Sequence, residues 1–283
     1  MNFDDAIRED LSGRVILHRR LQLVKKLGAG AFGAVYLAKE YAFDRPLREV
    51  AVKLTHEKNL SPEAACERLQ EGYSLCRLLL HAGNAKRFFI QVYEMGIAED
   101  CDNRAYLIME YVPGVRLMDH IRPERNGVPM SIARRYLGEL CEALAVCHSL
   151  TPALTHGDLK PDNILVDEQQ SLRVVDFGLA KPIDRLTGYA VTQSGCLAYT
   201  APETLLGRGY PQSDIYGIGL IMYEVLRGDG PHLHIPPPEN RQSLAYYFES
   251  KQTMTFEPLT SANQSVSQDH GLFEIVERCL RFD

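Results

Sequence analysis

Apolar and polar residues tend to alternate along the first part of the chain, as they do in β-strands. Between Leu21 and Leu54, β-branched and aromatic residues alternate with polar ones and glycines interrupt them, which predicts three antiparallel strands. Residues 88–96 and 104–112 predict two more strands. Between these regions, the sequence Ser61-Pro62-Glu63 is typical of a helix start. Leucines at positions 69, 75, 78 and 79 follow at near-helical intervals, so we expect a helix there.

The pattern changes at the sequence Val-Pro-Gly, residues 112–114. Residues 131–150 carry apolar side chains at positions 133, 137, 140, 144 and 147, a stripe that predicts a helix packed against a core. Most of the remaining chain also has helical character, whereas residues 227–242 and 251–270 are expected to be surface loops. The pattern therefore predicts a small β-rich lobe, joined near residues 110–114 to a larger α-rich lobe.

Composition narrows the class of protein. The 283 residues carry a net charge of −6 and contain no block of five basic residues, so nucleic acid is not an expected partner. The acidic start and the glycine-interrupted apolar stretch at 215–226 predict neither a signal peptide nor a membrane segment in this chain. Seven cysteines without a Cys-x-x-Cys pair indicate reduced thiols and a cytoplasmic location.

A glycine-rich stretch lies in the first predicted hairpin. Gly28, Gly30 and Gly33 follow the spacing G-x-G-x-x-G, which also occurs in dinucleotide-binding folds and in ordinary turns. A dinucleotide site needs a helix after the glycines, but here a strand pattern continues, so the glycines are expected to form a hairpin. Backbone N–H groups of such a loop can approach phosphate oxygens because no Cβ is in the way.

Lys53 lies inside an apolar strand pattern, where a charge is costly unless it is paired. Such a lysine often reaches solvent instead. Glu71 on the helix that follows is the natural counter-ion, and Glu67 is the other candidate. A charged pair close to a phosphate-binding loop indicates a nucleotide site.

Two later motifs hold further polar groups. The sequence Thr-His-Gly-Asp-Leu-Lys-Pro-Asp-Asn brings Asp158, Lys160 and Asn163 close together, although a solvated turn would have a similar composition. Asp176, in Asp-Phe-Gly, follows a short strand pattern, where its carboxylate could hold a hard cation such as Mg²⁺. Ala201-Pro202-Glu203 comes after both.

In this order, the motifs resemble those of the protein kinases, of the Ser/Thr type, from about residue 21 to the C-terminus. The resemblance implies an α+β, bilobal protein-kinase-like fold. Its small antiparallel β-rich N-lobe would have one main helix, and its larger C-lobe would be mainly α-helical. The corresponding boundaries are an N-terminal extension at 1–20, the N-lobe at 21–110 and the C-lobe at 111–283.

The resemblance also implies ATP and Mg²⁺ as cofactors and a protein as substrate. Gly28, Gly30 and Gly33 would cover the phosphates, and Lys53 would hold the α- and β-phosphates and pair with Glu71. The residues implied around the adenine ring are Val35, Ala51 and Leu165 on its faces, the gatekeeper Met109, and the backbone groups of Glu110 and Val112.

For the transfer itself, the resemblance gives Asp158 the role of accepting the proton of the substrate hydroxyl. Lys160 would steady the transferring phosphoryl group, and Asn163 and Asp176 would hold Mg²⁺. Asp214 would brace the loop that carries Asp158.

The sequence departs from the kinase pattern in three places. Gly157 replaces the arginine of His-Arg-Asp, which usually receives an activation-loop phosphate. Cys196 stands where a threonine usually bonds both Asp158 and Lys160. The chain stops at Asp283, before a helix whose arginine usually pairs with the equivalent of Glu203, so we expect the C-lobe to be truncated before its final helix.

Two other functions remain open at this point. His-Gly-Asp also resembles small-molecule phosphotransferases of related fold, against which Lys160, the Asp-Phe-Gly motif and the stretch before Glu203 argue. A nucleotide-binding scaffold without turnover is the second alternative, although every transfer residue is present. Because Gly157 offers no partner for a loop phosphate, we expect activity without phosphorylation of Thr187, Thr192, Ser194 or Thr200. Control would come from a partner or from a segment beyond Asp283.

Overall fold

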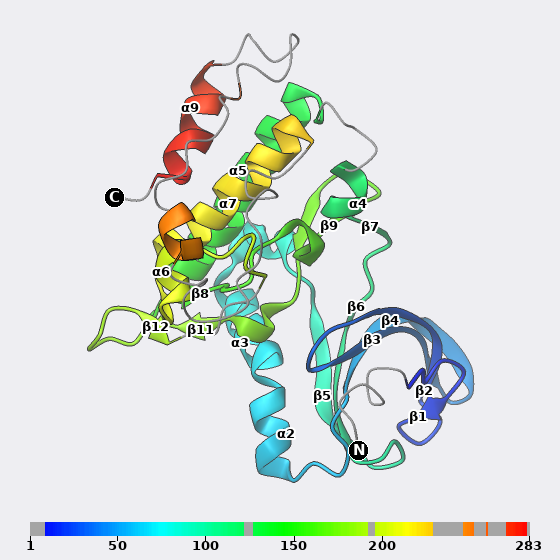
Figure 1. Cartoon of the computed structure of the whole chain (residues 1–283). Helices are drawn as coiled ribbons and strands as arrows, with labels where there is room; N and C mark the ends of the chain where they lie inside the picture. The colour runs from blue at the N-terminus through cyan, green and yellow to red at the C-terminus, as the bar shows by residue number, and fades with distance from the viewer. Residues whose placement is uncertain are drawn as a thin grey trace. The chain divides into compact units, whose positions relative to one another are not determined.

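The computed structural model describes residues 9–121, 127–191, 196–228, 246–251, 259 and 270–281. Within it, the chain divides into two compact units. The first runs to Leu80 and takes in Ile90–Val112, and the second comprises His81–Phe89 and the chain from Pro113 onward. Strands dominate the first unit and helices the second (Figure 1).

A six-stranded antiparallel sheet forms most of the first unit, in the order β1-β2-β3-β4-β6-β5. The strands are β1 (Val15–Ile16), β2 (Leu21–Ala29), β3 (Gly33–Ala42), β4 (Arg45–Thr55), β5 (Val92–Ala98) and β6 (Arg104–Glu110). β2, β3 and β4 are the three strands expected between residues 21 and 54. β5 begins later than the predicted residue 88, because Gly83–Phe88 form a 3-10 helix, η1, in the second unit.

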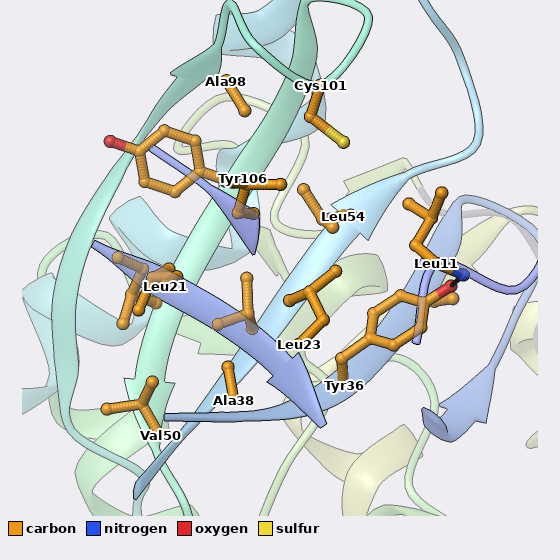
Figure 2. Close-up of a cluster of buried hydrophobic side chains, with 14 residues drawn as sticks. Leu11, Leu21, Leu23, Tyr36, Ala38, Val50, Leu54, Ala98, Cys101 and Tyr106 are labelled. Carbon is orange, nitrogen blue, oxygen red and sulfur yellow. Dashed lines mark hydrogen bonds between the residues drawn. The ribbon is translucent and has the colours of Figure 1, made fainter. Parts of the chain in front are cut away.

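The core of this unit includes the segment that precedes the expected N-lobe. Leu11 and Ile16 are buried in the same cluster as Leu23, Tyr36 and Leu54. Figure 2 shows Leu11 beside Tyr36, whose hydroxyl accepts a hydrogen bond from the Leu11 amide at 3.3 Å. β1 pairs with the start of β2, so residues 9–16 are part of the folded unit.

Two helices occupy the region where the leucine pattern predicted one. α2 (Pro62–Arg68) and α3 (Gln70–His81) are separated at Leu69, whose N–H bonds back to Ala65 and Cys66. The predicted start is confirmed, because the Ser61 hydroxyl accepts a hydrogen bond from the Ala64 amide at 3.3 Å. After this break α3 begins at Gln70, and Glu71 lies in its first turn.

The second unit contains the described helices α4 (Leu117–Ile121), α5 (Met130–Ser149), α6 (Pro202–Leu205), α7 (Pro211–Arg227) and α9 (His270–Cys279). The stripe predicted on α5 is confirmed, since its five apolar positions are buried. α7 packs against both α5 and α9 and is buried along most of its length. The loops expected at 227–242 and 251–270 lie largely outside the described residues.

Short strands and turns of the second unit carry its polar motifs. A three-stranded sheet has the order β10-β9-β7, and two-stranded pairs are β11-β8 and β12-β13. Their bounds are β7 (Gly114–Arg116), β8 (Leu154–Thr155), β9 (Ile164–Asp167), β10 (Leu172–Val174), β11 (Lys181–Pro182), β12 (Ala190–Val191) and β13 (Arg208–Gly209). The 3-10 turns η2 (Pro161–Asn163) and η3 (Phe177–Leu179) lie beside them in sequence. Over the described residues, no helix is long and apolar enough to cross a membrane.

Candidate functional site

The glycine stretch forms the hairpin between β2 and β3. Gly28 pairs with Val35, and the Gly30 amide donates to the Gly33 carbonyl at 2.9 Å to close the turn. A Cβ on Gly33 would lie 2.3 Å from the Leu54 carbonyl oxygen, so the neighbouring strand requires glycine there. A Cβ on Gly28 or Gly30 would meet nothing within 4 Å among the described atoms. Packing inside the chain therefore does not account for glycine at positions 28 and 30.

Lys53 and Glu71 form an ion pair in the first unit. Lys53 lies on β4, opposite Val35 of β3 and Leu107 of β6, and only 23% of its side chain is exposed. Glu71 lies in the first turn of α3 with 6% of its side chain exposed. Of the two carboxylates considered as counter-ions, Glu71 makes the pair, and Glu67 is exposed on α2.

The residues expected around adenine come from both units. Ala51 pairs directly with Met109 across β4 and β6, and both side chains are buried, as is Val112. The Glu110 amide donates to the Gln91 carbonyl at 2.8 Å. Leu165 lies on β9 in the second unit and is partly buried.

Asp158 is the centre of a hydrogen-bond cluster in the second unit. Lys160 Nζ lies 2.6 Å from Asp158 Oδ2, and Asn163 Nδ2 donates to the same oxygen at 2.9 Å and to the Asp158 carbonyl at 2.8 Å. The Cys196 amide donates to Asp158 Oδ1 at 3.1 Å. The structure thus brings together the three residues of the 158–163 stretch and adds a donor from residue 196.

The surroundings of Lys160 stabilise its positive charge. Burial by itself lowers the pKa of Lys160, but the hydrogen bond and charge of Asp158, with contributions from Cys196 and Asp176, outweigh burial and raise that pKa. Lys160 therefore remains an ammonium group across physiological pH. A fixed positive charge beside a carboxylate is suited to stabilising a transferred phosphoryl group.

Asp214, at the start of α7, holds the backbone that leads to Asp158. Its carboxylate accepts hydrogen bonds from the His156 amide at 3.0 Å and from the Gly157 amide at 3.2 Å. His148 Nε2 lies 2.9 Å from the same carboxylate. Gly157 has a φ of 78°, a conformation that costs other residues about 1–2 kcal/mol. The positive φ at position 157 thus explains why glycine is favoured in His-Gly-Asp.

Asn163 and Asp176 are the residues expected to hold Mg²⁺. The Asn163 amide nitrogen is engaged by Asp158, which leaves the side-chain carbonyl oxygen as a ligand. Asp176 lies next to Phe177, whose ring packs at 4.5 Å from that of His156 and at 5.9 Å from that of Phe89. Oxygen ligands fit Mg²⁺, which usually takes only one or two protein carboxylates together with substrate phosphates. The described residues contain no group of three or more His, Cys, Asp or Glu side chains placed to hold a metal.

Residues 196–200, which we call the docking loop, connect Asp158 to α7. The Tyr199 hydroxyl donates to Glu224 Oε2 at 2.5 Å, and the Thr200 hydroxyl donates to the Cys196 carbonyl at 2.9 Å. The side chains of Asp158, Cys196 and Thr200 line a pocket that reaches Asp214. The Glu203 carboxylate accepts a hydrogen bond from the Ser213 hydroxyl.

Sequence reasoning missed three side chains of this region: His148, His156 and Lys251. His156 is fully buried, its Nδ1 accepts from the Asp158 amide at 3.3 Å, and its Nε2 lies 3.3 Å from the Val175 carbonyl. Lys251 donates to carbonyls of the docking loop. The histidine in His-Gly-Asp was a visible signal, whereas His148 and Lys251 stand in stretches without a motif.

Comparisons with known proteins agree with this geometry. The family model of the protein kinase domain matches residues 21–283. CBL-interacting protein kinase 11 of Oryza sativa subsp. japonica is 32% identical over 222 residues, which cover 77% of this chain and 41% of that protein. CBL-interacting serine/threonine-protein kinase 7 of Arabidopsis thaliana is 34% identical over 219 residues, 76% of this chain and 48% of that protein. The chain spans about half the length of the curated relatives it matches.

The chain therefore belongs to the protein kinase family. The predicted fold class is confirmed: an antiparallel β-rich unit and a mainly helical unit are those of the protein kinase domain. The roles of individual residues and the lobe boundaries remain predictions.

Proposed function

We propose that this chain transfers the γ-phosphate of ATP to a serine or threonine hydroxyl of a protein. The proposal rests on three hydrogen bonds to the Asp158 carboxylate, which come from Lys160, Asn163 and the Cys196 amide. Two of these groups come from the loop of Asp158 itself, and the third comes from the docking loop. A proton acceptor is thus coupled directly to the segment that resembles the peptide-docking region of kinases.

In this proposal, Asp158 orients the acceptor hydroxyl and takes its proton, and Lys160 offsets negative charge on the transferred group. Lys53, aligned by Glu71, binds the α- and β-phosphates, and the N–H groups of the glycine hairpin approach the phosphate oxygens. Asn163 and Asp176 are the proposed Mg²⁺ ligands. When bound, the ion would neutralise charge on the phosphates.

The open space at Gly28 and Gly30 supports a phosphate ligand. Packing against the neighbouring strand explains why residue 33 is glycine. At positions 28 and 30 a larger side chain would fit, so packing does not explain the glycines there. A loop of that composition allows close approach of backbone N–H groups to an anion.

Serine and threonine are the proposed acceptors because Lys160 and the short distance from Asp158 to the docking loop suit a short side chain. Transfer to a peptide array should therefore favour serine and threonine over tyrosine. An array dominated by tyrosine would contradict this assignment.

The first experiment incubates the chain with Mg²⁺ and γ-labelled ATP and offers it generic proteins, peptides and small hydroxyl compounds in parallel. We expect label on serine and threonine, none with Asp176→Ala, and a loss of about 10²–10⁴-fold in turnover with retained ATP binding for Asp158→Asn. Label on small compounds alone would favour a small-molecule phosphotransferase. ATP binding without any transfer would favour a scaffold.

Lys53→Met tests the proposed nucleotide site, with Lys39→Met, at an exposed position of β3, as the matched control. Transfer should be lost only in Lys53→Met, and loss of the ion pair with Glu71 should also lower the free energy of unfolding, by up to about 3–5 kcal/mol. Normal turnover in folded Lys53→Met would contradict the nucleotide site.

We propose that the transfer activity of this chain does not require a phosphate on the loop between Asp176 and Glu203. Three basic residues in or near the loop could take the place of the missing arginine: Arg173, Lys181 and Arg185. Arg173 already donates to the Phe89 carbonyl at 3.2 Å, and Lys181 and Arg185 are exposed. Thr187 donates to Asp184, while Thr192 and Ser194 lie outside the described residues. Phosphatase treatment should change the rate by less than about tenfold, which is about 1.4 kcal/mol in barrier.

We further propose a regulatory partner or an additional segment as the source of control, and a cytoplasmic location. The two relatives above are named for interaction with CBL, which makes control by a partner protein reasonable here. All seven cysteines are free thiols, as expected in a reducing compartment.

A further inference from the structure

Lys251 lies in a helical segment that includes residues 246–251, and it is 2% exposed. Its ammonium group donates to the carbonyls of Leu197 at 2.7 Å, Ala198 at 3.1 Å and Thr200 at 2.6 Å. A lysine ammonium has three N–H donors, so each can be used by one carbonyl. All three acceptors belong to the docking loop.

Burying the charged ammonium group away from water costs free energy unless polar groups of the protein form hydrogen bonds with it. The partners here are backbone oxygens of one short loop. Three carbonyl dipoles that converge on one point repel one another unless a positive charge or donor lies between them. The loop conformation and the buried ammonium group therefore stabilise each other.

Aromatic rings and charged groups surround the Lys251 ammonium group. The ring centroid of Tyr216 on α7 lies 5.8 Å from Nζ, and that of Tyr247 on the same helical turn lies 5.4 Å away. Burial lowers the pKa of Lys251 to about 7, and the charges of Cys196 and Glu203 act in the opposite direction. Burial raises the pKa of Tyr247 to about 12 and raises that of Tyr216 as well, so neither phenol titrates near neutrality.

The docking loop also reaches the proposed catalytic base. The Cys196 amide, one residue before the first of these carbonyls, donates to Asp158. Tyr199, between the second and third carbonyls, is bonded to Glu224. Lys251 thus contacts the backbone on both sides of Tyr199, in the segment between Cys196 and Pro202.

We propose that Lys251 is a positioning residue that sets the conformation of the docking loop and, through it, the affinity for the peptide acceptor. The effect on the acceptor rests on the proposed transfer function, whereas the effect on the loop does not. A neutral amine has only two N–H donors, so one carbonyl loses its donor when Lys251 is deprotonated. Loop order and acceptor affinity should therefore both decline as pH rises through neutrality.

The kinetic test compares Lys251→Met with Tyr246→Ala, a control at an exposed position on the same turn. For Lys251→Met, KM for a serine peptide should rise at least about tenfold while KM for ATP stays within about twofold. A variant that only folded less well would lower kcat and leave both KM values unchanged. In the wild type, kcat/KM for the peptide should fall several-fold between pH 6.5 and pH 9, on the order of the change expected for one group titrating near neutrality. That fall should be absent in Lys251→Met.

Hydrogen exchange tests the loop without any need for turnover. The amides of Tyr199 and Thr200 donate to the carbonyls of Cys196 and Leu197, and they should exchange at least about tenfold faster in Lys251→Met. Exchange in α5 should not change. In the wild type, the same two amides should lose protection relative to α5 as pH rises from 6.5 to 9, which keeps the test decisive if Lys251→Met does not fold.

Kinetics and hydrogen exchange together distinguish a failure of the proposed transfer function from a failure of the role proposed for Lys251. If the wild type transfers no phosphate, the proposed function fails, and exchange alone decides whether Lys251 orders the loop. Unchanged exchange in the variant and in the pH series, or an unchanged peptide KM in an active variant, would overturn the role of Lys251.

Discussion

Cys196 contacts Asp158 through its backbone amide, while its side chain is exposed. Kinases of the Ser/Thr type usually have a threonine here, whose hydroxyl bonds Asp158 and Lys160. A thiol is a weaker donor and acceptor than a hydroxyl, so this site is expected to lack one good hydrogen bond to a charged group.

Cys196→Thr should therefore raise kcat for a serine peptide by about 3–10-fold, because a hydrogen bond to a charged group contributes about 1.5–3 kcal/mol and only part of it acts in the transition state. Steady-state kinetics measure the change. Cys66→Ser, at an exposed position of α2, is the control and should leave kcat unchanged. A lower kcat in Cys196→Thr would show that the cysteine has a role that a hydroxyl cannot take.

Gly157 shows how a substitution in a motif can depend on backbone conformation. Gly157→Ala should lower the free energy of unfolding by about 1–2 kcal/mol, because φ is 78° there. Gly138→Ala, at an exposed position of α5 with nothing within 4 Å of an added Cβ, should raise it by about 0.5–1 kcal/mol. Urea denaturation of both variants gives the comparison. The same sign for both would contradict the left-handed conformation at Gly157.

At the scale of elements, β1 and the residues before it complete the sheet of the first unit. The Gly13 amide donates to the Leu23 carbonyl at 2.7 Å, and the Leu23 amide donates to the Arg14 carbonyl at 2.8 Å. Buried Arg104 on β6 pairs with Glu9 and donates to the Thr55 carbonyl at 2.7 Å. Residues 9–16 thus contact three strands, although their sequence has no strong strand pattern.

Leu11→Ala should destabilise the protein by about 2–4 kcal/mol, because the leucine is 6% exposed within the core cluster shown in Figure 2. Val15→Ala, at a position 49% exposed on β1, is the control and should change the free energy of unfolding by less than about 1 kcal/mol. The midpoint of urea denaturation reports both. Equal, small effects would show that residues 9–16 do not stabilise the sheet.

At the scale of the whole molecule, Lys251 links stability to pH. Its pKa is about 7 in the folded protein and 10.5 in the unfolded reference, so the unfolded chain binds more protons between those values. Global unfolding exposes Lys251 to water, so the free energy of unfolding should rise with pH from about 7 to about 10, whereas the loop opening described above leaves Lys251 buried. Below pH 7, Lys251 is protonated in both the folded and the unfolded state, so its unfavourable contribution to the free energy of unfolding no longer changes with pH.

The measurement is the difference in unfolding free energy between the wild type and Lys251→Met at pH 6.5, 8 and 9.5. That difference should move in favour of the wild type by a few kcal/mol as pH rises, on the order of 1.4 kcal/mol for each unit of pKa shift. Taking the difference removes the titration of groups common to both proteins, such as the buried cysteines. A difference that is independent of pH would show that Lys251 keeps its charge throughout.

The sequence by itself determined the family, the order of elements and most of the polar groups of the candidate site. Strand alternation over 21–54 and the stripe on α5 are local periodicities, and each element formed where its own residues predicted it. Asp158, Lys160 and Asn163 lie within six residues of one another, so a single loop was sufficient to bring them together.

The tertiary structure decided the contacts between distant segments. Lys53 could pair with Glu67 or Glu71 by sequence, and in the folded chain the partner is Glu71, which is buried in the first turn of α3, whereas Glu67 is exposed on α2. Leu11 and Lys251 carry no motif, and their burial depends on strands and loops more than 10 residues away in sequence. Local pattern reports which face of an element is apolar, but it does not report which distant backbone carbonyls need a donor. Only the folded chain brings the ammonium group of residue 251 to the carbonyls of residues 197–200.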